Sequence, residues 1–232
     1  MSNHANAIRV RLATGPKSGS QIAGEIGLSQ PTVARALGTM GDEVVKIGQK
    51  KSSRYLLRDQ SRGFSEVPVY RVDATGKVKE LGMLVPVRAD GFVFTQADGE
   101  QIHSEGLPWW LLDMRPQGFL GRAYAARYGA ELGLPSNVKE WSDNHAIRAL
   151  LVHGHDLVGN LLIGNVARDK FIKMPEPKPI SIADKSMAYA SLAVGAAAGE
   201  SPGSSAGGEQ PKFTAYVESA GMAKHVIVKF SE

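Results

Sequence analysis

The sequence has 232 residues, a length that favours two or three modules over one compact domain. Hydrophobic residues make up 43% and charged residues 22%, which excludes a fibrous or disordered chain. Cysteine is absent, which excludes disulfides, thiolate metal sites and thiol catalysis. Neither a long apolar run nor the apolar core of a signal peptide is present, so we expect a cytoplasmic protein with no membrane partner.

The net charge of +4 is concentrated near the N-terminus. Residues 1–60 hold nine Lys and Arg against four Asp and Glu, a surplus of +5, whereas residues 61–232 sum to −1. Duplex DNA is a dense line of negative charge. A small basic segment ahead of a neutral body therefore favours a nucleic-acid-binding module.

Residues 19–37 (GSQIAGEIGLSQPTVARAL) have the spacing of two helices joined by a tight turn. Gly27 supplies a turn conformation that a residue with a β-carbon would resist. Ser29 is suited to cap the second helix, and Pro31 fits its first turn. This pattern resembles the helix-turn-helix family of DNA-binding domains, in which the segment SQPTVARAL would be the recognition helix.

The segment EVVKIGQKKSSRYLLR, residues 43–58, has two β-prone runs around a polar loop, which predicts the hairpin of a winged variant. The resemblance implies that Ser29, Gln30 and Thr32 face base edges and that Arg35 contacts a base or a phosphate. It also implies that basic residues of the wing contact phosphates, namely Lys50, Lys51 and Arg54. A three-helix module used for dimerisation or protein docking is the alternative.

The middle of the chain predicts an α+β body. Residues 67–97 alternate between apolar and polar side chains and predict an antiparallel meander, with turns at Asp73–Gly76 and Ala89–Gly91. Helical spacing follows between residues 107 and 154, and residues 156–166 (DLVGNLLIGNV) have a strand-like composition.

Two groups of side chains in this body favour packing over chemistry. Trp109 and Trp110 are flanked by leucines, which favours a place in the core over a stacking platform for bases. His145, His153 and His155 lack the spacing of metal ligands, so we expect no metal site there.

Glycine is dense near the C-terminus, where it occupies five of the fourteen residues from Gly195 to Gly208, after a helix expected over residues 184–198. Strands are expected at residues 212–217 and 225–230. A glycine-rich loop that leads into a strand lets backbone N–H groups approach a phosphate. Lys229, in the second strand, has the position of the lysine that pairs with nucleotide phosphates in kinases. A flexible linker is the alternative.

The segments SSAGGEQPKFTA and HVIVKF resemble the HipA family of bacterial serine/threonine kinases, the toxins of HipBA-type toxin–antitoxin pairs. A winged helix fused ahead of such a body is similar to the YjjJ (HipH) branch of that family. The resemblance implies a winged helix-turn-helix at residues 1–60, a HipA-like N-terminal subdomain at residues 61–175, and the start of a kinase N-lobe at residues 176–232.

The same resemblance implies a set of site residues. ATP, with Mg²⁺, would bind at Gly207, Gly208, Gln210, Lys212 and Lys229. Ser205, with Ser204 as a second candidate, would be autophosphorylated, and the added negative charge would oppose ATP phosphates in that loop. The implied partners are operator DNA and a protein substrate, with an antitoxin and a second copy of the chain as further candidates.

Kinases place the catalytic aspartate and the Mg²⁺ ligands C-terminal to the ATP lysine. Only Phe230, Ser231 and Glu232 follow Lys229. We therefore expect the chain to be the N-terminal portion of a longer kinase, without catalytic or metal-binding residues of its own and inactive alone. The alternative function is a non-enzymatic DNA-binding transcriptional regulator, in which the kinase-like body senses a signal or dimerises.

Overall fold

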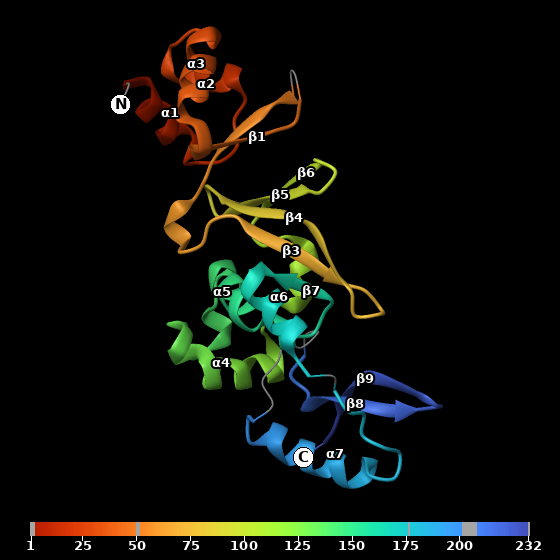
Figure 1. Cartoon of the computed structure of the whole chain (residues 1–232). Helices are drawn as coiled ribbons and strands as arrows, with labels where there is room; N and C mark the ends of the chain where they lie inside the picture. Colours follow the sequence, from red (N-terminus) through yellow and green to blue (C-terminus); the bar gives the residue numbers. More distant parts are fainter. Residues whose placement is uncertain (1–2, 50–51, 176, 201–207, 232) are drawn as a thin grey trace. The chain divides into compact units, whose positions relative to one another are not determined.

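The computed structural model describes residues 3–49, 52–175, 177–200 and 208–231 (Figure 1). Helices and antiparallel strands are both present, as expected for an α+β chain. The chain divides into two compact units, Met1–Tyr70 with Lys79–Trp109 and Arg71–Val78 with Trp110–Glu232. No helix within the described residues has the length and apolar character needed to cross a membrane.

The first unit begins with three helices, which are α1 (Asn3–Leu12), α2 (Gly19–Ile26) and α3 (Gln30–Met40). The turn predicted between α2 and α3 is confirmed. Gly27 ends α2 in the left-handed conformation, with φ of 68° and its N–H directed to Ala23 O. Ser29 caps α3, since its side chain accepts a hydrogen bond from Thr32 N–H. The side chains of Ile8 and Val33 are fully buried between the helices.

A hairpin follows the helices and consists of β1 (Val44–Ile47) and β2 (Arg54–Leu57). The two strands are antiparallel, with Val45 opposite Leu56. These two side chains are buried against Val85, Val87 and Val93, which belong to the following sheet. The hairpin is therefore packed on one face.

The predicted meander is confirmed, and its strands are β3 (Val67–Val72), β4 (Val78–Val87), β5 (Gly91–Gln96) and β6 (Gln101–Glu105). β4 pairs antiparallel with β5, and β5 with β6, while β3 lies beside β4. The first predicted turn forms because the Asp73 carboxylate accepts hydrogen bonds from the N–H groups of Thr75 and Lys77.

The elements of the second unit are α4 (Gly118–Leu132), α5 (Asp143–His153), β7 (Leu161–Ile163), α6 (Gly164–Lys173), α7 (Lys185–Ala197), β8 (Lys212–Ser219) and β9 (Met222–Lys229). The predicted helix over residues 184–198 and the terminal hairpin are confirmed. The strand-like interpretation of residues 156–166 is wrong beyond the three residues of β7. Gly164, with φ of 84°, begins α6 at that point.

The prediction that Trp109 packs in the core is wrong, because its side chain is 79% exposed. Residues 109–114 form a 3₁₀ helix, in which side chains three apart lie on the same face. Trp109 and Leu112 share the exposed face, whereas Leu111 and Met114 share the buried one. The tighter helix thus decides which side chains enter the core.

A buried ion pair lies where the hairpin meets the sheet. The Arg62 Nε–Asp59 Oδ2 distance is 3.0 Å, and both residues are buried. Arg62 also donates to Val87 O at 2.6 Å and lies 4.8 Å from the centre of the Phe92 ring. Arg88 approaches the other carboxylate oxygen of Asp59 at 3.0 Å. A buried charge is tolerated only when it is paired in this way.

Replacing Asp59 with Asn should lower the free energy of unfolding by about 3 kcal/mol, because the buried Arg62 would lose its carboxylate partner at 3.0 Å. Urea denaturation of the wild type and the variant measures this loss. Asp42→Asn, at an exposed position of the same unit, is the control and should have little effect.

The stability difference should also depend on pH. Burial alone would raise the pKa of Asp59, but hydrogen bonds from Ser61 and Arg62 and the charge of Arg88 hold it below its usual value. The ionised carboxylate therefore stabilises the fold above the pKa of an unfolded Asp, about 3.9. The difference between the wild type and Asp59→Asn should shrink as the pH falls through the folded pKa. A difference that stays constant down to acid unfolding would contradict this role.

Candidate functional site

The exposed face of α3 carries part of the predicted nucleic-acid contact set. Gln30 and Arg35 are exposed, and Thr32 is half-buried. The Ser29 hydroxyl lies 2.9 Å from that of Thr32, so both hydroxyls take part in the cap at the start of the helix. Arg35 donates from Nε to Pro31 O at 3.4 Å and extends along the helix surface.

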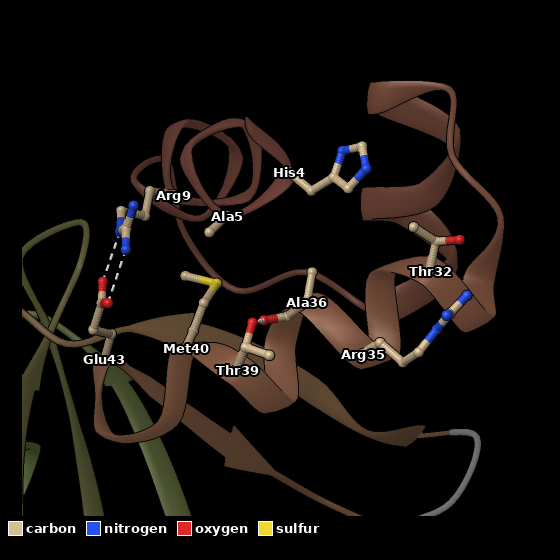
Figure 2. Close-up of a pocket in the computed structure, with 9 residues that line it drawn as sticks. All are labelled: His4, Ala5, Arg9, Thr32, Arg35, Ala36, Thr39, Met40 and Glu43. Carbon is tan, nitrogen blue, oxygen red and sulfur yellow. Dashed lines mark hydrogen bonds and ion pairs between the residues drawn. The ribbon is translucent and has the colours of Figure 1, made fainter. Parts of the chain in front are cut away.

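A groove of about 750 Å³ runs between α1 and α3 (Figure 2). Its apolar floor consists of Ala5, Ala36 and Met40. Thr32 and Arg35 lie at one end, and the Arg9–Glu43 ion pair lies at the other. The predicted contact residues of α3 therefore border a hollow as well as an open surface.

The Arg9–Glu43 pair was missed by the sequence analysis. Arg9 Nε and Nη2 donate to the two carboxylate oxygens of Glu43 at 2.6 and 2.8 Å. This two-point hydrogen bonding lowers the pKa of Glu43. The residues are 34 positions apart, so no local pattern could have paired them. Because Glu43 neutralises Arg9, the positive charge of Arg9 is less available to a ligand than that of Arg35.

The hairpin presents Arg54 at the start of β2, exposed and opposite Ile47. Lys46, on β1, is also exposed. Lys50 and Lys51 lie outside the described residues, so their predicted contacts stay predictions.

Two lysines face each other at one end of the terminal hairpin. In the register of β8 and β9, Lys212 lies directly opposite Lys229. Lys212 is 4% exposed, and its Nζ donates to Gly208 O at 3.1 Å. Gly208 has φ of 99°, and a β-carbon at this position would lie 3.4 Å from Nζ. A glycine here therefore leaves space for the ammonium group.

The electrostatics of this site favour an anionic ligand. Burial lowers the pKa of Lys212, and the positive charge of Lys229 lowers it further. Like charges directly opposite each other in a hairpin destabilise it. A phosphate near both ammonium groups would remove that repulsion. The structure thus brings together three of the five predicted phosphate-site residues, namely Gly208, Lys212 and Lys229.

One further predicted residue, Gln210, is not brought into the site. Gln210 is exposed in the bend before β8. Gly207, Ser204 and Ser205 lie outside the described residues, and their roles stay predictions.

A small cavity of about 70 Å³ lies between Tyr124, Tyr128, His153 and His155. The hydroxyl of Tyr124 and Nδ1 of His153 are 2.7 Å apart. Burial raises the pKa of Tyr124 and lowers that of His153, so both are held in their neutral forms. Among the described residues, no group of three His, Asp or Glu could hold a metal ion.

Comparison with known proteins gives a family match for the middle of the chain. Residues 64–172 match the family model of the YjjJ-like toxin, middle domain. The chain is also 38% identical over 221 residues to Toxin YjjJ of Escherichia coli (strain K12). The aligned region covers 95% of this chain and 50% of the toxin, so the chain spans about half the length of this curated relative. No solved structure gives a significant match.

These matches support the resemblance to the YjjJ branch that segments near both ends of the chain indicate. The family model covers the region of the meander, α4, α5, β7 and most of α6. The identity to Toxin YjjJ extends over nearly the whole chain. The chain is therefore similar to Toxin YjjJ over 95% of its length.

Replacing Lys229 with Ala should raise the pKa of Lys212, because one of the two causes of its depression is removed. The rise should be partial, since Lys212 stays buried. An NMR titration of lysines labelled with ¹³C at the ε carbon measures it. Lys224→Ala, on the same strand but opposite Val217, is the matched control. An unchanged pKa of Lys212 in Lys229→Ala would show that the two ammonium groups do not interact.

Proposed function

We propose that the chain is the DNA-binding and nucleotide-binding portion of a HipA-like toxin, a serine/threonine protein kinase of the YjjJ branch. The observation that carries the proposal is the opposed pair Lys212 and Lys229 beside Gly208. A phosphate group placed between two lysines that face each other is attracted by both charges, and a nucleoside triphosphate supplies such a group. The similarity to Toxin YjjJ supports the toxin class.

ATP fits the described residues better than Mg²⁺ does. The two ammonium groups are suited to phosphate oxygens, and Gly208 allows close approach of the chain. The described residues offer no acidic cluster for a magnesium ion. In the proposed kinase, ATP supplies the phosphoryl group, while Lys212 and Lys229 orient its phosphates. The Mg²⁺ ligands and the catalytic aspartate would come from a further part of the protein.

The three helices and hairpin of the first unit are proposed to be a winged helix that binds operator DNA. The capped start of α3 and its exposed Arg35 support this role, because recognition helices present their N-terminal half to base edges. Arg54 on β2 would contact a phosphate. Lys50 and Lys51 are assigned the same role from the sequence alone.

The remaining assignments follow from the same proposal. Residues 1–60, 61–175 and 176–232 would be the winged helix, the N-terminal subdomain and the start of the kinase N-lobe. A cellular protein would be the kinase substrate, and Ser205 or Ser204 would be the autophosphorylation site. An antitoxin and a second copy of the chain are the further partners proposed for this cytoplasmic protein.

A second candidate function is a DNA-binding regulator without kinase activity. The groove between α1 and α3 favours it, since a ligand there would contact Thr32 and Arg35, which are also the proposed DNA contacts. In this case the second unit would serve as a sensing or dimerisation body. The two functions differ in what they require of Lys229.

Lys229→Ala in the complete gene product should reduce ATP-dependent phosphorylation by about 100-fold or more, because the phosphates lose a charged partner. Radiolabelled phosphate transfer and growth inhibition on expression are the two measurements. Lys224→Ala is the control, as an exposed lysine on the same strand. Full toxicity and intact repression in Lys229→Ala would favour the regulator over the kinase.

The double variant Arg35→Ala with Arg54→Ala should bind a mixed-sequence DNA duplex more weakly than the wild type. Each lost phosphate contact should flatten the plot of log affinity against log salt by about 0.9. Fluorescence anisotropy over a range of salt concentrations measures both effects. Lys79→Ala, an exposed lysine of β4, is the control. Unchanged affinity and slope in the double variant would leave dimerisation or protein docking as the role of the three helices.

A further inference from the structure

The first turn of α4 is bonded to the residue that holds Lys212. The N–H of Phe119 donates to Gly208 O at 3.3 Å. The first amides of a helix have no acceptor within the helix, so this bond satisfies a group that would otherwise need water. The same carbonyl oxygen accepts the hydrogen bond from Lys212 Nζ. Gly208 O is therefore shared between α4 and the buried lysine.

Two arginines of α4 hold the residues on either side of segment 201–207. Arg127 Nη1 donates to Glu200 O at 3.0 Å, ahead of the segment. Arg122 forms an ion pair with Glu209, directly after Gly208. Helix α4 thus contacts the chain both before and after the segment.

The aromatic contacts of Phe119 tie the same turn to the hairpin. Its ring meets Phe230 edge-on at 6.4 Å between centroids, and Phe230 lies 6.0 Å from Phe213. Phe213 is 1% exposed and follows Lys212 in β8. Phe230 follows Lys229. The start of α4 therefore packs against the residues next to both lysines.

We propose that α4 positions the nucleotide site, with Arg122 as the positioning residue that fixes Gly208, through the ion pair with Glu209, and hence the ammonium group of Lys212. The proposal rests on the proposed nucleotide-binding function. Arg122 acts from outside β8 and β9, since it pairs with the residue that follows Gly208. When this ion pair is broken, Gly208 O can move away from Lys212, and the phosphate-binding geometry is lost.

The size of the effect follows from the exposure of the contacts. The side chains of Arg122 and Glu209 are 48% and 62% exposed, so solvent screens their attraction. Arg122→Ala should weaken binding of an ATP analogue about threefold. Arg122 is exposed, so its replacement should leave the fold intact.

The decisive test is a charge exchange between Arg122 and Glu209. Calorimetry with the 232-residue chain and a non-hydrolysable ATP analogue should show weaker binding for Arg122→Glu and recovery for Arg122→Glu combined with Glu209→Arg. A structural loss of packing would not be restored by the second substitution. Arg148→Ala, an exposed arginine of α5, is the matched control and should bind like the wild type.

A second measurement separates this proposal from the nucleotide-binding function itself. Hydrogen exchange of the Phe119 amide, followed without nucleotide, should accelerate in Arg122→Ala and return to the wild-type rate in the exchanged pair. If the wild type binds no ATP analogue but exchange responds in this way, the nucleotide function fails and α4 still positions Gly208. If the analogue binds equally to all variants and exchange is unchanged, the positioning role is wrong.

Discussion

Lys212 places a positive charge at the base of the terminal hairpin, and neighbouring groups of the second unit surround this charge. Its ammonium group is directed to Gly208 O, while Lys229 lies opposite across the two strands. The carbonyl is a neutral acceptor, so this hydrogen bond lowers the cost of burying the charge without neutralising it. The phenylalanines around Phe213 exclude water from one side. The proposed nucleotide site depends on this opposed pair of lysines.

Local chemistry made several elements predictable from the sequence. The turn at Gly27 and the cap at Ser29 depend on residues within a few positions of each other, and both were predicted correctly. The meander followed from its alternation and its turn residues in the same way. For the candidate site, the resemblance to the HipA family supplied Lys212 and Lys229, and the structure added their register.

Contacts between distant residues could not be predicted. Arg9 and Glu43 are 34 positions apart, and Arg122 and Glu209 are 87 apart. No periodicity connects such residues, since their proximity depends on how helices and strands pack. Trp109 shows a different limit, because its exposure depends on whether residues 109–114 turn with three or 3.6 residues per turn. The apolar composition of residues 109–114 is compatible with either helix, so it does not predict which side chains are buried.

The connection between β2 and β3 is bonded along much of its length. Arg58 N–H donates to Glu43 O, Asp59 N–H donates to Pro86 O, and the Arg62 side chain reaches Val87 O. The three helices are therefore joined to β4 by these hydrogen bonds as well as by the chain itself. Cleavage of the backbone near Gly63 by a protease would not separate the helices from the sheet. A partner that binds the sheet would therefore be connected to α3 through these hydrogen bonds.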